Sequence, residues 1–142
     1  MSIKLFVATK AFIEHNGKVL ILRESSNYAD GTNTSKYDMP GGRLEPGQHF
    51  LKSLHREISE EAGLVGEVHE PFFVNEWRPV KNGEEWQIVG IFFCCTVISP
   101  KITLSQDHDA YEWIDPKEFK QYDLIPNLQL AFEAYLEHTQ KN

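Results

Sequence analysis

Runs of β-forming residues, separated by polar breaks, predict a series of strands along much of the chain. Two Asn-Gly pairs, Asn16-Gly17 and Asn82-Gly83, lie between such runs. Because Asn-Gly readily adopts the positive φ angles of a tight turn, each pair predicts a β-hairpin. Polar residues 25–35 predict a loop, and Pro40-Gly41-Gly42 is expected to break the strand before it. The predicted strands and short extended pieces are 4–13, 19–22, 37–39, 67–77, 86–97, 101–104 and 111–114.

Two other stretches show the three- and four-residue hydrophobic spacing of helices. The first runs from about residue 48 to 62, with Gly63 where a C-cap belongs, and the second covers 127–138. A shorter helix is expected to begin at Asp115-Pro116, with the aspartate as N-cap. The order of strands, helix, strands and helix predicts an α/β fold with a mixed sheet between helices, in one domain over residues 1–142.

Charge and hydropathy narrow the classes of partner. The 142 residues carry a formal net charge of −7, which disfavours binding of a nucleic-acid polymer but permits a small phosphorylated substrate whose charge is screened by metal ions. We find no segment that predicts a signal peptide or a membrane span, and we expect a cytoplasmic protein with no membrane partner. A monomer and a homodimer both remain open.

The two cysteines, Cys94 and Cys95, are adjacent within a predicted strand. Neighbouring side chains on a strand point to opposite faces, and a disulfide between them would be strained. We therefore expect two small apolar residues, since no further zinc ligands at suitable spacing are found nearby in the sequence.

A cluster of acids lies near the end of the first predicted helix, in Arg56-Glu57-Ile58-Ser59-Glu60-Glu61. At about 100° per residue, the three glutamates share a narrow arc beside the apolar stripe. Like charges at this spacing repel, and the C-terminal end of a helix disfavours negative charge. Converging carboxylates are the ligands that Mg²⁺ or Mn²⁺ prefers, and Arg56 is placed to pair with one of them. The alternative interpretation is a solvated acidic face.

Residues 42–64 resemble the Nudix box. The family pattern is Gly-x₅-Glu-x₇-Arg-Glu-U-x-Glu-Glu-x-Gly-U, where U is a bulky aliphatic residue. This chain matches every fixed position except one, where Gln48 replaces the first glutamate. The segments 37–42 and 113–116 also resemble the family, and the general resemblance extends over roughly residues 4–136.

The resemblance implies an α/β/α sandwich and Mg²⁺-dependent hydrolysis of a nucleoside diphosphate linked to another group. Carried over by position, the metal ligands are Glu57, Glu60, Glu61 and the carbonyl of Gly42. Glu57 and Glu60 are also the catalytic candidates, with Arg56 orienting Glu57. Mn²⁺ is the alternative ion.

Further site residues are expected outside the box. Asp107 resembles an acid that binds metal or acts as base in many relatives, and His108 beside it is a candidate phosphate contact. Arg23 resembles a substrate-binding arginine in MutT-type relatives, and Asn127 resembles a base-reading asparagine. Each has a simpler interpretation, namely a loop acid, a surface histidine, a strand-end charge and a helix N-cap.

Aromatic residues of the later strands, Phe73, Trp77 and Trp86, fit either base stacking or the core. At Gln48 the amide keeps an acceptor oxygen but loses the charge, so we expect weaker binding of an outer metal without loss of the chemistry.

Three activities fit this sequence. We expect first a (deoxy)nucleoside triphosphate as substrate, cleaved to the monophosphate and pyrophosphate. ADP-ribose or another nucleotide sugar is the second candidate. A nucleotide-sensing domain with little turnover is the third, and the intact glutamates Glu57, Glu60 and Glu61 speak against it.

Overall fold

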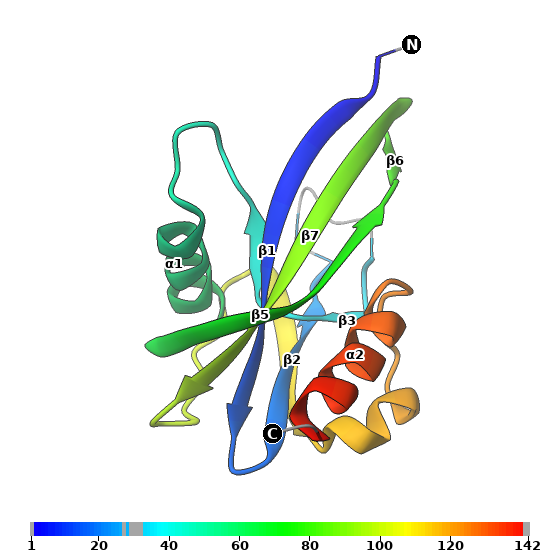
Figure 1. Ribbon diagram of the computed structural model, residues 1–142. Helices are drawn as coiled ribbons and strands as arrows, with labels where there is room; N and C mark the ends of the chain where they lie inside the picture. The colour runs from blue at the N-terminus through cyan, green and yellow to red at the C-terminus, as the bar shows by residue number, and fades with distance from the viewer. Residues whose placement is uncertain (1, 27, 29–32, 141–142) are drawn as a thin grey trace.

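A mixed β-sheet runs through the middle of the molecule, with one helix packed on each face (Figure 1). The computed structural model describes residues 2–26, 28 and 33–140, so part of the predicted loop 25–35 lies outside the described residues. The strands are β1 (Lys4–His15), β2 (Lys18–Glu24), β3 (Tyr37–Asp38), β4 (Gly41–Arg43), β5 (Gly66–Trp77), β6 (Val80–Lys81), β7 (Glu84–Val97) and β8 (His108–Ile114). The helices are α1 (Phe50–Ala62), the 3₁₀ helix η1 (Pro116–Gln121) and α2 (Leu128–Gln140).

The strand order is β3-β2-β1-β7-β5, with β4 added to β1, β8 to β2 and β6 to β7. The long central strands β1 and β7 are parallel, and every other pair of named strands in the described residues is antiparallel, which confirms the predicted mixed sheet. Both Asn-Gly hairpins are present, with φ of 52° and 79° at Asn16 and Gly17, and 51° and 77° at Asn82 and Gly83. Each predicted turn therefore joins two antiparallel strands, β1 to β2 and β6 to β7.

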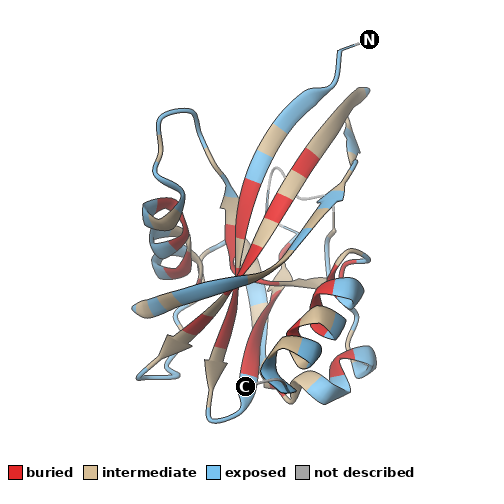
Figure 2. Cartoon of the chain, viewed as in Figure 1, coloured by how far each residue is buried: buried red, intermediate tan, exposed pale blue. Residues whose placement is uncertain are grey.

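Alternate residues of the central strands enter two separate cores. Phe12 on β1 belongs to the core under α2, whereas its neighbour Ile13 belongs to the core under α1. Figure 2 shows the buried positions on the central strands and on the helix faces turned toward them. Cys94 and Cys95 follow the same alternation and both are free thiols, as predicted. Within the described residues, neither helix has the length and hydropathy needed to cross a bilayer.

Three local details differ from the simplest sequence prediction. Residues 101–104, predicted as a short extended piece, do not join the sheet; instead the backbone N–H of Thr103 donates to the Ala62 carbonyl at 2.9 Å and covers the end of α1. Helix α1 begins at Phe50 rather than near 48, because His49 caps it through Nδ1. Asn127 does not cap α2, since its Oδ1 is buried and accepts no hydrogen bond.

The predicted break at Pro40-Gly41-Gly42 does end the preceding strand, but Gly41 and Gly42 also begin a strand that the sequence did not predict, β4, paired antiparallel with β1. Gly41 has a φ of 140°, and a Cβ placed there would lie 2.0 Å from the carbonyl oxygen of Thr9. Only glycine allows the two backbones to come this close. This contact brings the start of the box against the central strand.

Replacing Gly41 by alanine should therefore destabilise the protein severely. We expect Gly41→Ala to lower the free energy of unfolding by about 3 kcal/mol or more, measured by urea denaturation. Gly47→Ala is the matched control, because Gly47 also has a positive φ, 90°, but faces open space. It should cost about 1 kcal/mol. Equal losses in the two variants would show that the contact with Thr9 does not matter.

Candidate active site

A cavity of about 500 Å³ opens where β1 changes its antiparallel partner. Near its end β1 pairs with β2 at Glu14 and His15, but at Ala8, Thr9 and Lys10 it pairs with β4. Chain segments far apart in sequence meet at this split in the sheet. The wall includes parts of β1, β4, β7, the end of α1 and the segment before α2.

The three glutamates of α1 lie at different depths. Glu61 lines the cavity and accepts a hydrogen bond from the backbone N–H of Gly41 at 3.1 Å. Glu57 has 19% of its side chain exposed and lies against Gly42, where an added Cβ would be 3.1–3.3 Å from its carboxylate. Glu60 is outermost, with 61% of its side chain exposed. The acidic arc therefore runs from the cavity wall to the surface.

Arg56 pairs with the acids as predicted. Its Nη2 lies 3.3 Å from Oε1 of Glu57, and its Nε lies 4.0 Å from Oε1 of Glu60. The guanidinium therefore reaches the two outer carboxylates.

A buried cation, Lys10, faces the innermost acids and was missed from the sequence. Its Nζ donates to Oδ2 of Asp38 at 2.9 Å, and only 12% of its side chain is exposed. The electrostatic influence of Lys10 extends to Glu57 and Glu61. Its signal in the sequence is a single charge in the otherwise uncharged run from Leu5 to Ile13.

The closeness of Lys10 and Glu61 changes the pKa of both side chains. Burial raises the pKa of Glu61 well above its ordinary value, and the nearby Glu57 raises it further, while Lys10 works in the opposite direction. Burial lowers the pKa of Lys10, but Asp38, Glu61 and Glu57 outweigh that effect and the net shift is upward. Lys10 therefore stays charged, and the acid cluster is short of positive charge.

The residues predicted outside the box separate into two groups. Asp107, His108 and Asn127 line the cavity, together with Gly42 from the box. Arg23 is not among the described lining residues; its Nε donates to Oδ1 of Asp109 at 2.7 Å. A substrate contact by Arg23 stays a prediction.

Three buried polar atoms around the cavity make no hydrogen bond within the described residues. They are Nε1 of Trp86, Nδ1 of His108 and Oδ1 of Asn127. Burial lowers the pKa of His108, and nearby acids such as Asp38 only partly oppose this, so the ring favours its neutral form. Buried polar atoms without partners are costly, and they mark places where a ligand supplies the missing partner.

Gln48 forms its polar contact locally. Its Oε1 accepts from the backbone N–H of Glu45 at 3.0 Å, and its own backbone N–H donates to the Glu45 carbonyl at 3.1 Å. The side chain thus closes the turn before α1, and its influence on an outer metal stays a prediction.

The family model of the NUDIX domain matches residues 4–135 of the chain. The chain belongs to the Nudix hydrolase family. Curated relatives called nucleoside triphosphatase NudI are 26% identical in Escherichia fergusonii and 28% identical in Salmonella arizonae. Each match covers 79% of this chain and 83% of the relative.

Solved Nudix structures show the same fold. A MutT protein from Methanosarcina mazei Go1 superimposes with a TM-score of 0.82 at 23% identity, covering 100% of this chain and 99% of that one. A NUDIX hydrolase from Nitrosomonas europaea gives 0.77 at 25% identity, covering 95% and 90%. The predicted α/β/α Nudix fold is therefore confirmed.

Nudix hydrolases typically depend on a divalent metal, and the donor atoms here suit one. Glu57 lies against the backbone of Gly42, and Glu61 is held beside Gly41, so hard oxygen ligands come together at the cavity. The partner cation Lys10 does not balance the nearby acids alone. A small, hard cation fits both this oxygen set and the surplus of negative charge.

Removing the charge of Lys10 should raise the pKa of Glu61 further. In metal-free protein, we expect Lys10→Met to shift the titration of Glu61 to higher pH, measured by carboxyl ¹³C NMR and assigned with Glu61→Gln. At a given pH more of Glu61 would then be protonated. Lys4→Met is the control, because Lys4 lies on the same strand but pairs with Glu84 rather than with the acids of α1. An unchanged titration of Glu61 in Lys10→Met would disprove the coupling.

Proposed function

We propose that this Nudix hydrolase cleaves nucleoside triphosphates to the monophosphate and pyrophosphate with Mg²⁺. The observation that carries this proposal is the composition of the cavity wall. The wall combines acidic groups such as Glu61 and Asp107 with indole rings and with buried polar atoms that make no hydrogen bond within the described residues. A nucleotide carries both kinds of group that such a wall fits, namely phosphates with their metal ion and a planar base.

The acidic part of the cavity fits the diphosphate with its ion. Gly42, Glu57, Glu60 and Glu61 would hold Mg²⁺, which neutralises the anionic diphosphate and makes a water more acidic when bound. A carboxylate then has to take the proton of the attacking water. The candidates are Glu57, Glu60 and Asp107, and Arg56 keeps Glu57 oriented through its 3.3 Å contact.

The remainder of the cavity fits a base and further phosphates. Trp77 and Trp86 supply aromatic faces, and Asn127 supplies a free acceptor. Arg78 and Lys81 also line the wall and bring positive charge.

The relatives support the same substrate class, because the matched proteins are called nucleoside triphosphatases. A structural neighbour from Streptococcus suis is called an ADP-ribose pyrophosphatase, but at 18% identity this likeness shows only the fold. ADP-ribose and other nucleotide sugars therefore enter as competing outcomes of the test.

The test is a panel of nucleoside triphosphates, deoxynucleoside triphosphates, ADP-ribose and nucleotide sugars with Mg²⁺, with products separated by chromatography. We expect kcat/KM to be highest for a nucleoside or deoxynucleoside triphosphate, with monophosphate and pyrophosphate released in equal amounts. A higher kcat/KM for ADP-ribose or a nucleotide sugar would replace the proposed substrate. No turnover of any compound would favour a nucleotide sensor.

The variant Glu60→Gln tests whether the hydrolysis depends on the glutamates of α1. Because Glu60 is mostly exposed, this change should leave the fold intact and lower kcat/KM by about 100-fold or more. Glu67→Gln is the matched control, since it removes the same charge from an exposed position on β5 and should be fully active. Full activity in Glu60→Gln would contradict the assignment.

A further inference from the structure

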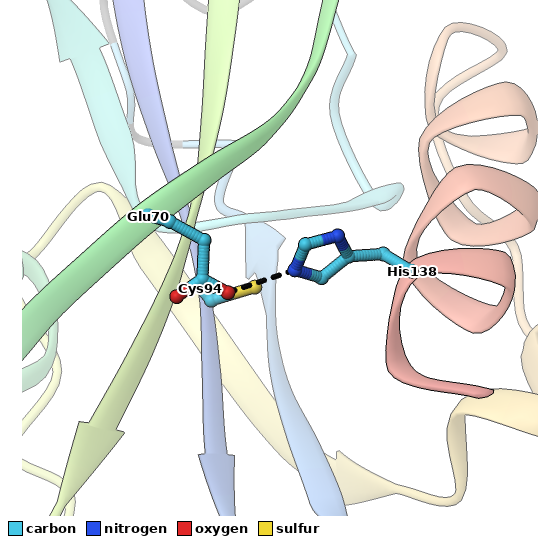
Figure 3. Close-up of side chains that lie close together, drawn as sticks. All are labelled: Glu70, Cys94 and His138. Atoms are coloured by element: carbon cyan, nitrogen blue, oxygen red, sulfur yellow. Dashed lines mark hydrogen bonds and ion pairs between the residues drawn. The ribbon is translucent and has the colours of Figure 1, made fainter. Parts of the chain in front are cut away.

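Three side chains of different chemistry point toward one another (Figure 3). Glu70 comes from β5, Cys94 from β7 and His138 from the last turn of α2. One ligand atom from each, a carboxylate oxygen, Sγ and a ring nitrogen, lies within 4.8 Å of the other two. Nε2 of His138 is 2.7 Å from Oε2 of Glu70.

This cluster is separate from the candidate active site. None of the three residues is among the described residues that line the cavity. Cys94 packs against the core under α2, on the sheet face opposite to Cys95. The proposed hydrolysis uses none of these groups, so their convergence needs another explanation.

We propose that Glu70, Cys94 and His138 form a second metal site, for Zn²⁺ or a similar borderline cation, with water as the fourth ligand. Thiolate sulfur, imidazole nitrogen and carboxylate oxygen are the ligands that Zn²⁺ takes in proteins. Mg²⁺ and Ca²⁺ prefer oxygen throughout, so this set selects against the ion of the acidic cluster. The two sites would therefore hold different metals.

The geometry requires only a small adjustment. With bonds of about 2.0–2.3 Å, ligand atoms of a tetrahedral zinc site lie roughly 3.3–3.8 Å apart. Side-chain movements of about 1 Å close the difference from the present spacing. Glu70 and His138 have 52% and 30% of their side chains exposed, so an ion and a water can reach the site from solvent.

The surroundings also favour a cation. His138 lies in the last turn of α2, where the helix dipole is negative, and Glu70 adds a carboxylate. Burial raises the pKa of the Cys94 thiol to about 12, and Glu70 adds to this. The free protein therefore holds a neutral thiol. On binding, the S–H bond breaks, the metal–sulfur bond forms and the proton goes to solvent.

Folding gives Cys94 two neighbours that its position in the sequence does not reveal. No further zinc ligand is near the cysteines along the chain, but folding brings Glu70 and His138 to the same side of the sheet as Cys94. The partners are 24 and 44 residues away, since 94 − 70 = 24 and 138 − 94 = 44. Such separations are outside the spacing of local zinc motifs.

Co²⁺ titration tests the proposal in the intact protein. Co²⁺ takes the same ligands as Zn²⁺ and gives a near-ultraviolet charge-transfer band only when a thiolate binds it. Excess Mg²⁺ is added to occupy the oxygen ligands of the acidic cluster, which cannot produce this band. We expect one equivalent of Co²⁺ to give the band, Zn²⁺ to abolish it by displacement, and about one proton to be released per ion.

Variants then identify the ligands. Cys94→Ser should lose the band, and His138→Gln and Glu70→Gln should each weaken Co²⁺ binding at least about tenfold. The controls are Cys95→Ala, which removes the neighbouring thiol on the other face, and His69→Gln, which removes an exposed histidine next to Glu70. Both should keep the wild-type band and affinity.

Two results would overturn the proposal. One is the absence of a thiolate band in the wild-type protein, which would leave the Glu70–His138 contact as a link between α2 and the sheet. The other is a band that survives Cys94→Ser. Neither result bears on hydrolysis, because Co²⁺ binding is read without substrate.

Discussion

The gathering of carboxylates beside the buried cation Lys10 is the constraint on which this structure depends. Burial raises the pKa of Glu61 and the neighbouring Glu57 raises it further, while Lys10, whose charge is shared with Asp38, offsets only part of this effect. Charged carboxylates withdrawn from water in this way are unfavourable unless a cation joins them or a proton neutralises one of them. A bound cation would therefore stabilise the charged form of these acids.

The split in the sheet makes this gathering of charge possible. At Gly41 the backbone of β4 approaches β1 so closely that no side chain fits, and Gly42 leaves room for the carboxylate of Glu57. The same pairing puts Lys10 directly opposite Gly41. One short strand, β4, thus brings the carboxylate of Glu57, the side chain of Lys10 and the glycine backbone together, and the cavity opens beside it.

Local chemistry explains what the sequence could predict. The Asn-Gly turns, the helix stripe, the pairing of Arg56 and the arc of glutamates all depend on residues a few positions apart. The strand β4 was missed because a Pro-Gly-Gly segment is typical of a break, and its pairing with β1 is a contact across the fold. A lone charge at Lys10, within a strand, was the overlooked local signal.

Other features arise only from folding. Asn127 at the start of a helix predicted a cap, yet its Oδ1 is buried at the cavity without a partner. The guanidinium of Arg23, which is predicted to contact the substrate, donates a hydrogen bond to Asp109, 86 residues away in the sequence. Likewise, no spacing rule links Cys94 to His138. These relations depend on sheet order and helix packing, which hydrophobic periodicity does not specify.

The most direct test of this account is a measurement of Mn²⁺ binding by electron paramagnetic resonance, in which the signal of free Mn²⁺ disappears as the ion binds. We expect wild-type protein to bind Mn²⁺ without substrate. Glu61→Gln should weaken this binding at least about tenfold, because the substitution removes the innermost carboxylate. Equal Mn²⁺ affinity in wild type and Glu61→Gln would contradict the claim that the buried acids create the metal site.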